Sequence, residues 1–276
     1  LAHGVRSRSV LGSRPYLRPL RAAPRPTRTG VLVADRSTAR TFIGFEGSIE
    51  EIGRPLEVDG GKSNYGGFGG YSEHKVRSRA DEVTTRLWRE AGQRLLDRHL
   101  DSSLDSLLLG GQGEVLDEMR EQLHPYLKSL PSSSFAVSPA DVSIARLRSE
   151  IDEQRRELRH RNERELVSKV MAAAQRGSGA VTGLADSLRA ANAQAISDLV
   201  VAGSFSRPGV MCPECGYLDR SGSNCQVCSA PMHEVVDVVG ALIDATVESG
   251  GAVHQVVVGS ALDRDGVGAL TRFDIG

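Results

Sequence analysis

Apolar and polar positions along the first part of the chain follow patterns that predict β-strands. The run Gly30–Asp35 is mostly apolar, and residues 39–45 alternate between apolar and polar side chains. These two segments predict a hairpin, and residues 50–58 predict a third strand at its edge. Residues 104–109 form a short apolar run bounded by polar positions, which predicts a buried strand.

A helical period follows the hairpin. Residues 73–101 place apolar side chains on one face at helical spacing: Val76, Ala80, Val83, Leu87, Ala91 and Leu95. We expect further helices at 114–127, 138–176, 181–194 and 235–249, and strands at 195–202, 252–259 and 268–274. Strands that alternate with helices predict a mixed α/β fold (α/β with α+β character) built from two layer-sandwich domains.

Composition shifts predict where the domains begin and end. Residues 1–26 are rich in Arg and Pro and are expected to be the tail of a missing N-terminal domain plus a linker. The two domains are then expected at 27–130 and 140–276. A Pro/Ser-rich linker is expected between them, at 131–139.

All four cysteines lie within seventeen residues and form two Cys-x-x-Cys pairs, Cys212/Cys215 and Cys225/Cys228. Two such pairs nine residues apart have the spacing of a tetrahedral zinc site, here in a ribbon over residues 210–233 that is inserted into the second domain. Four sulfurs close the coordination shell, so the Zn²⁺ would be structural rather than catalytic. A redox dithiol pair or two disulfides are the alternative interpretations.

Charge and hydropathy exclude two classes of protein. The net charge of −1 over 276 residues excludes a polycation, so any nucleic-acid contact would depend on local basic patches. No apolar run approaches the roughly 20 residues of a transmembrane helix. We therefore expect a soluble protein without a membrane partner, and reduced, metal-bound cysteines favour a cytoplasmic location.

The order of these parts resembles the middle and C-terminal domains of the superfamily that contains archaeo-eukaryotic peptide-chain release factor subunit 1 and Pelota. The resemblance covers most of residues 27–276. It rests on the hairpin at 30–45, the Gly-rich loop at 59–72, the strand and turn Leu107–Gly113, the four-cysteine ribbon and the stretch 234–256. Within the superfamily the chain looks most like the bacterial branch, which includes the Balon-type ribosome hibernation factors.

The tripeptide Gly110-Gly111-Gln112 is an apparent match to the catalytic Gly-Gly-Gln of release factors, in which an amide positions the hydrolytic water. Its position argues against that role, because it directly follows the apolar run 104–109 and precedes an expected helix. We interpret it as a strand-to-helix turn. The segment that corresponds to the catalytic loop is 59–75, and it contains no glutamine.

The Gly-rich loop combines aromatic side chains with cations, which suits it to RNA. Aromatic rings stack on unpaired bases at about 1–3 kcal/mol per base, and cations bind phosphates. The resemblance makes this RNA ribosomal, and the alternative is a disordered surface loop without a role. The candidate rRNA-binding residues are Lys62, Tyr65, Gly66, Gly67, Phe68, Gly69, Gly70, Tyr71, His74, Lys75, Arg77 and Arg79.

The resemblance implies a non-catalytic factor of the hibernation type rather than an enzyme. It would occupy the vacant A site, contact rRNA of both ribosomal subunits and reach the peptidyl transferase region with the Gly-rich loop. It implies elongation factor Tu or another translational GTPase as a partner of the C-terminal domain, and no small-molecule substrate. The alternatives are a release or rescue factor that hydrolyses peptidyl-tRNA through Gln112, or a Pelota-like surveillance adaptor.

Overall fold

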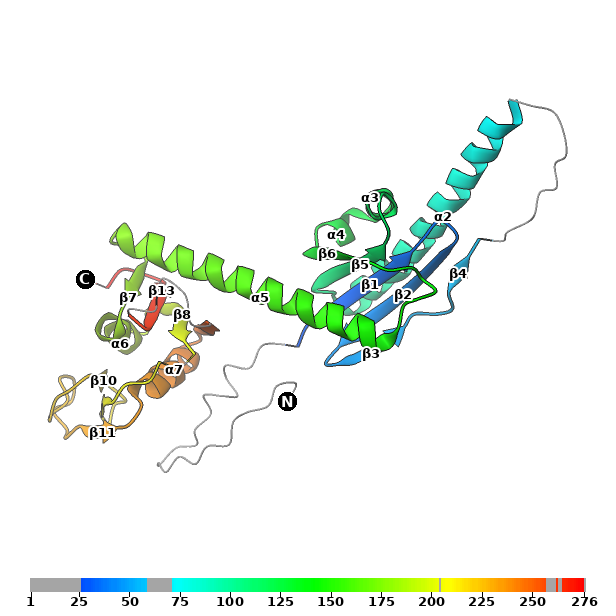
Figure 1. Ribbon diagram of the computed structural model, residues 1–276. Helices are drawn as coiled ribbons and strands as arrows, with labels where there is room; N and C mark the ends of the chain where they lie inside the picture. The colour runs from blue at the N-terminus through cyan, green and yellow to red at the C-terminus, as the bar shows by residue number, and fades with distance from the viewer. Residues whose placement is uncertain (1–25, 59–70, 204, 257–261, 263–264, 276) are drawn as a thin grey trace. The chain divides into compact units, whose positions relative to one another are not determined.

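The computed structural model describes residues 26–58, 71–203, 205–256, 262 and 265–275, with the side chains of 71–78 excepted (Figure 1). They fall into two compact units. The first unit extends to Leu158, and the second unit starts at Arg159. The predicted boundary, at residues 131–139, lies earlier in the chain.

The first unit is built on a mixed sheet with the strand order β3-β2-β1-β5-β6, and β4 also pairs with β2. Its strands are β1 (Arg28–Ala34), β2 (Thr38–Phe45), β3 (Ser48–Glu51), β4 (Leu56–Glu57), β5 (Ser106–Gly111) and β6 (Ser132–Ala136). The hairpin β1–β2 is antiparallel and β1, β5 and β6 run parallel. The hairpin and β5 are as predicted, with ends shifted by one or two residues, but the single strand expected at 50–58 is divided into β3 and β4.

Helices cover both faces of this sheet. They are α2 (Tyr71–Ser102), α3 (Val115–Glu121), α4 (Pro125–Lys128) and the first half of α5 (Ile144–Gln175). One face packs Leu32 and Leu109 against Trp88 and Met119 of α2 and α3. The other face, which includes Val31 and Leu108, packs against Leu147 and Ile151 of α5. A sheet covered on both sides explains why β1 and β5 read as continuous apolar runs.

Two predictions for this unit are wrong. The helix expected over 114–127 is interrupted, because Pro125 holds the preceding His124 in an extended conformation (ψ 145°) that ends one helix and starts the next. The linker expected at 131–139 contains β6, which pairs with β5 and buries Phe135. The first three residues of this strand are serines, so the sequence lacks the apolar alternation that predicts a strand. The helix predicted from residue 138 accordingly starts later, at Ile144.

The second unit contains a four-stranded sheet with the order β12-β8-β13-β7. Its strands are β7 (Ala180–Thr182), β8 (Ile196–Ala202), β12 (Ala252–Val256) and β13 (Val267–Thr271). The helices α6 (Leu184–Asn192) and α7 (Val238–Glu248) pack on one face. The second half of α5 packs Val167 and Val170 on the other face. The mixed α/β class predicted from the sequence is confirmed.

A three-stranded ribbon separates β8 from α7, as the cysteine spacing predicts. It consists of β9 (Gly209–Met211), β10 (Leu218–Asp219) and β11 (His233–Val235) in the order β10-β9-β11. We call residues 209–235 the cysteine ribbon. The two helices expected in this unit are each shorter than predicted, because their first residues form β7 and β11 instead. The last strand ends at Thr271 rather than 274.

Candidate functional site

The four cysteines lie on two turns with the same backbone geometry. In the first turn the Gly216 N–H donates to the carbonyl of Cys212 at 3.0 Å, and in the second the Ser229 N–H donates to the carbonyl of Cys225 at 2.9 Å. Gly216 and Ser229 both have positive φ angles, of 77° and 62°. Each turn thereby directs its two sulfurs toward the other turn.

The sulfurs form one compact cluster. The closest Sγ–Sγ distances are 3.4 Å for Cys212–Cys228, 3.5 Å for Cys215–Cys225 and 3.6 Å for Cys215–Cys228. All four sulfurs lie within 4.8 Å of one another, and all four thiols are free. A tetrahedral ion with Zn–S bonds of about 2.3 Å separates its sulfurs by about 3.8 Å. The cluster therefore fits a metal ion such as zinc, and the sequence prediction of the four ligands agrees with this geometry.

The surroundings of the thiols give them different pKa values. Burial raises the pKa of Cys225, but the backbone N–H groups of Cys228 and Val227 lower it more, to a value of about 6. The Tyr217 amide lowers the pKa of Cys215, yet partial desolvation and the neighbouring thiols raise it to about 12. A metal ion that binds all four sulfurs must therefore displace protons as it binds.

The base of the cysteine ribbon is part of the core of the second unit. Leu218 is 2% exposed and packs with α6 and α7. The side-chain amide of Asn192 donates to the Leu218 carbonyl at 2.8 Å and accepts its N–H at 2.9 Å. A Cβ on Gly209 would lie 2.7 Å from both Val238 Cβ and the Asp219 carbonyl oxygen, so only glycine fits there. The sulfur cluster thus rests on a base that the protein core holds.

The Gly-Gly-Gln tripeptide lies in the first unit, where β5 ends. Gly110 and Gly111 are buried residues of β5, and Gln112 is exposed before α3. A Cβ on Gly110 would meet Val137 at 2.8 Å and Val33 at 2.9 Å. The glycines therefore permit close packing of the sheet, in the strand-to-helix setting that the sequence predicts.

The structure describes the candidate rRNA-binding residues to three different extents. Residues 62–70 lie outside the described part of the chain. Tyr71, His74, Lys75 and Arg77 fall on the first turns of α2, where only the backbone is described. Arg79 follows on the same helix and is exposed. The first two turns of α2 extend beyond the sheet in Figure 1, and residues 79–83 are all exposed.

Thr84 and Trp88 of α2 are hydrogen-bonded to Arg36 and Asp35 after the end of β1, and we call these four residues the α2 anchor. Trp88 Nε1 donates to the carbonyl of Asp35 at 2.9 Å, and Thr84 Oγ1 donates to the carbonyl of Arg36 at 2.9 Å. Trp88 is the single tryptophan of the chain and is 2% exposed. The Arg36 guanidinium also pairs with Glu118 at 3.0 Å and with Asp81 at 3.5 Å. The spacing of these residues along the sequence does not indicate this anchor.

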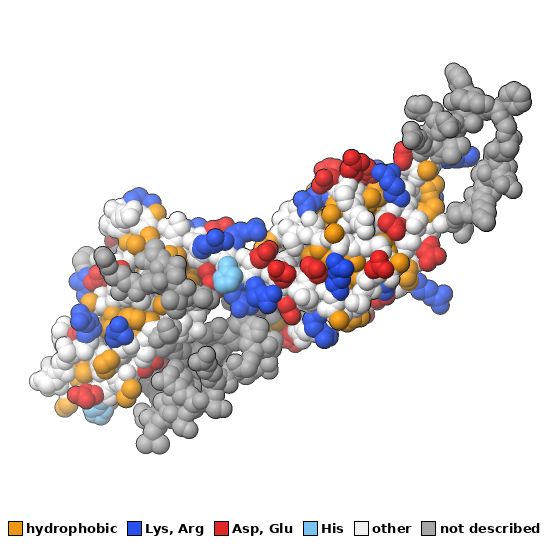
Figure 2. Space-filling view, in the orientation of Figure 1, with side chains coloured by type: hydrophobic (Ala, Val, Ile, Leu, Met, Phe, Trp, Pro, Cys, Tyr) orange, Lys and Arg blue, Asp and Glu red, His pale blue; other side chains and the backbone are white. Residues whose placement is uncertain are grey.

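A depression of about 260 Å³ lies over the α2 anchor, and Arg36, Asp81, Thr84, Thr85, Trp88 and Glu118 line it. Its charged groups already pair with one another. On the face of the first unit seen in Figure 2, Lys and Arg side chains are mixed with Asp and Glu side chains. This face therefore presents no surface of a single sign.

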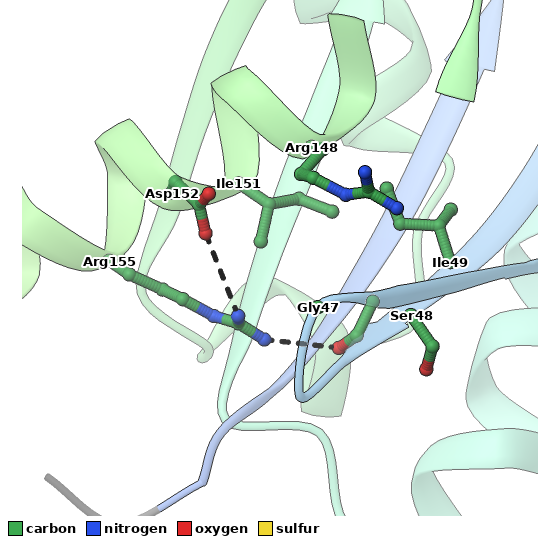
Figure 3. Close-up of a pocket in the computed structure, with 8 residues that line it drawn as sticks. Gly47, Ser48, Ile49, Arg148, Ile151, Asp152 and Arg155 are labelled. Atoms are coloured by element: carbon green, nitrogen blue, oxygen red, sulfur yellow. Dashed lines mark hydrogen bonds and ion pairs between the residues drawn. The ribbon is translucent and has the colours of Figure 1, made fainter. Parts of the chain in front are cut away.

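Figure 3 shows a second depression, between the β2–β3 turn and α5. It has room for only about 10 Å³ and is lined by Ile49, Arg148, Ile151, Asp152 and Arg155, among others. Arg155 donates to the carbonyls of Thr27 at 2.6 Å and Gly44 at 3.3 Å. Arg155 thus fastens α5 to the sheet, and the space is too small for an organic ligand.

One side-chain pair in the second unit joins two strands of the sheet. His254 Nε2 lies 3.1 Å from Asp198 Oδ1 on the neighbouring strand β8. The two residues are 56 positions apart, so only the parallel pairing of β8 with β12 brings them together. Ser197 Oγ also donates to Asp198, at 3.0 Å.

The described part of the chain thus consists of two α/β units, the second with a four-cysteine insertion between β8 and α7. Profile comparison matches residues 15–156, just over half of the chain, to Bacterial archaeo-eukaryotic release factor family 10. The chain belongs to this family. Comparison with curated protein sequences gives no match.

Solved structures show the same fold. Ribosome-bound archaeal Pelota, solved with ABCE1, has a TM-score of 0.53 and 17% identity, over 90% of this chain and 62% of Pelota. Dom34 of S. cerevisiae, a translation termination-like factor that interacts with Hbs1, has a TM-score of 0.50 and 12% identity, over 90% of this chain and 64% of Dom34. This chain therefore spans less than two thirds of the length of either protein. Within the described residues, no helix is long and apolar enough to cross a membrane.

Proposed function

We propose that this chain is a non-catalytic ribosome-binding factor of the hibernation type. In this proposal it occupies the vacant A site, contacts rRNA and reaches the peptidyl transferase region with the Gly-rich segment that precedes α2. The family, which is that of release factors, supports a role in translation. The similarity of fold to ribosome-bound Pelota is consistent with it.

The burial of Gly110 and Gly111 is the observation that carries the non-catalytic part of the proposal. A catalytic Gly-Gly-Gln needs glycines whose backbone is open to the ester of the substrate. Here the space beside each glycine is taken by protein atoms, which are Val137 and Val33 at Gly110 and the Ala34 carbonyl at Gly111. The segment 59–75, in the position of the catalytic loop, has no glutamine.

The length of α2 and the α2 anchor support the ribosome-binding part of the proposal. The helix starts more than three turns before Thr84, residues 79–83 are exposed, and the α2 anchor holds the direction of the helix from Thr84 on. The Gly-rich segment is attached to the far end of this extension. A helix that carries cations such as Arg79 away from the core suits contact with a phosphate backbone.

We further propose that the cysteine ribbon binds structural Zn²⁺ and that a translational GTPase, such as elongation factor Tu, binds the second unit. When bound, the zinc would cross-link the two turns. It would not act in catalysis, because four sulfur ligands leave no coordination position for water. Dom34, whose fold is similar, interacts with Hbs1. This similarity is the support for a partner on the second unit.

Co-sedimentation with bacterial ribosomes tests the proposal. We expect the chain to sediment with ribosomes whose A site is empty and to be lost when tRNA fills that site. Replacing residues 66–71 with a Ser-Gly linker should weaken binding at least about tenfold, because the aromatic contacts of Phe68 and Tyr71 disappear. Arg79→Ser should weaken it less, and Arg98→Ser, at the other end of α2, serves as the matched control. Unchanged sedimentation of the linker variant would contradict the role of the loop.

Hydrolysis of peptidyl-tRNA on stalled ribosomes distinguishes the enzyme alternative. We expect no release of the nascent peptide by the wild-type chain, and no difference between it and Gln112→Ala. Gln112 is exposed, so its replacement leaves the core intact and the comparison is clean. Release by the wild-type chain that Gln112→Ala abolishes would establish a hydrolase in place of the proposed factor.

A further inference from the structure

One edge of the sulfur cluster is accessible from solvent. Cys215 and Cys228 are exposed, whereas Cys212 and Cys225 are 1% and 4% exposed. The two exposed sulfurs lie 3.6 Å apart and come from different turns. Val227, beside Cys228, is itself 69% exposed and does not cover this edge.

We infer that the Cys215–Cys228 edge is an oxidative modification site whose reactant is a hydroperoxide. Oxidation joins the two sulfurs in a disulfide and releases the metal ion. This inference rests on the cluster alone, and it holds whether or not the chain binds ribosomes.

The reaction balances with the hydroperoxide as the oxidant. A thiolate sulfur attacks the peroxide, the O–O bond breaks, and the cysteine becomes a sulfenic acid while an alcohol leaves. The second thiolate then attacks this sulfur, the S–S bond forms, and the oxygen leaves as water after protonation. In sum, two thiols and one hydroperoxide give one disulfide, one alcohol and one water.

Access rather than distance selects this pair. The Cys212–Cys228 and Cys215–Cys225 distances, 3.4 and 3.5 Å, are as short as the 3.6 Å of Cys215–Cys228. Each of the first two pairs includes a buried cysteine. The peroxide therefore oxidises Cys215 or Cys228 first, and the other surface cysteine moves onto the oxidised sulfur more easily than a cysteine held in the core. The exposed sulfurs need to approach by about 1.5 Å to reach the disulfide bond length of about 2.05 Å. Flexible turns at the surface allow a shift of this size more easily than the buried core does.

Oxidation at this edge leaves the metal with Cys212 and Cys225 alone. Two thiolates hold Zn²⁺ far more weakly than four, so the ion dissociates. The new disulfide links the same two turns that the metal linked. The base of the ribbon keeps its own attachment through the Asn192–Leu218 hydrogen bonds.

Titration of the zinc-loaded full chain with hydrogen peroxide tests this inference. A metal-binding dye reports released zinc, and mass spectrometry of non-reduced peptides locates the disulfide. Trypsin cuts after Arg220 and separates the two turns, and a Glu-specific protease cuts after Glu214 and separates Cys212 from Cys215. We expect one zinc released per disulfide, and a cross-linked pair of peptides that contain Cys215 and Cys228. A reductant together with zinc should restore the metal-bound form.

Two variants keep the test decisive even where they bind zinc poorly. Cys212→Ser retains both exposed thiols and should still form the Cys215–Cys228 disulfide. Cys228→Ser should not give any cross-link between the tryptic peptides at the same peroxide concentration. A first disulfide within one turn, a first disulfide that includes Cys212 or Cys225 in the wild-type chain, or zinc that stays bound after the thiols are oxidised would each overturn the inference.

Discussion

The cysteine ribbon and the α2 anchor are both places where irregular backbone is fixed, and they use different forces. The ribbon has strands of only two or three residues, so its outer turns depend on what the four sulfurs bind. The α2 anchor uses backbone carbonyls of Asp35 and Arg36 together with a buried tryptophan. A ligand set is local in sequence and can be recognised there. An anchor that joins residues 53 positions apart becomes visible only in the fold.

Preventing metal binding should have the largest effect on stability. This effect should be confined to the second unit. In Cys212→Ser/Cys225→Ser two buried cysteines of the cluster are lost, and we expect the ribbon to unfold and the second unit to lose roughly 5 kcal/mol or more of stability, since Leu218 loses its cover. Hydrogen exchange measured by mass spectrometry reads both units in one experiment. Protection should fall in β8 and remain unchanged in β5. Equal loss in both strands, or none in β8, would show that the metal site is not what holds the ribbon.

Trp88→Ala should destabilise the first unit by about 3–5 kcal/mol, because a large buried side chain leaves a cavity. Trp88→Phe keeps most of the apolar contact and loses the hydrogen bond to Asp35, which should cost about 0.5–1.5 kcal/mol. Urea unfolding of both variants measures the difference. If Trp88→Phe lowers the free energy of unfolding as much as Trp88→Ala does, then the hydrogen bond to Asp35 contributes more to the α2 anchor than packing does.

Gly110→Ala should destabilise the first unit by about 1–3 kcal/mol, since its Cβ would lie 2.8 Å from Val137, 2.9 Å from Val33 and 3.0 Å from Phe135. Gln112→Ala, two positions on and exposed, is the control and should stay within about 0.5 kcal/mol of the wild-type chain. Thermal unfolding compares the two. A Gly110→Ala variant as stable as the wild-type chain would mean that the glycine is not there for packing and would reopen the catalytic interpretation.

The sequence was informative where one short segment carries a whole feature. The hairpin, strand β5, the long helix α2 and the cluster of four cysteines each follow from local pattern, and the structure agrees with these predictions. Strand β6 was missed because serines occupy it and its stability comes from pairing with β5. The break before Pro125 was missed although the proline itself signals it. The Asp198–His254 pair and the α2 anchor were missed because parallel strands and helix packing bring together residues that sequence spacing does not relate.

The smallest expected effect distinguishes the two turns of the ribbon. Ser229 has a positive φ of 62°, in the region that favours glycine, whereas Gly216 holds the equivalent position of the first turn. Ser229→Gly should relieve this strain and stabilise the zinc-bound ribbon by about 0.5–1 kcal/mol, and Gly216→Ser should destabilise it by a similar amount. Competition with a chelator measures both as changes in zinc affinity of about twofold to fivefold, in opposite directions. Changes of the same sign would mean that the two turns are not equivalent in how they hold the metal.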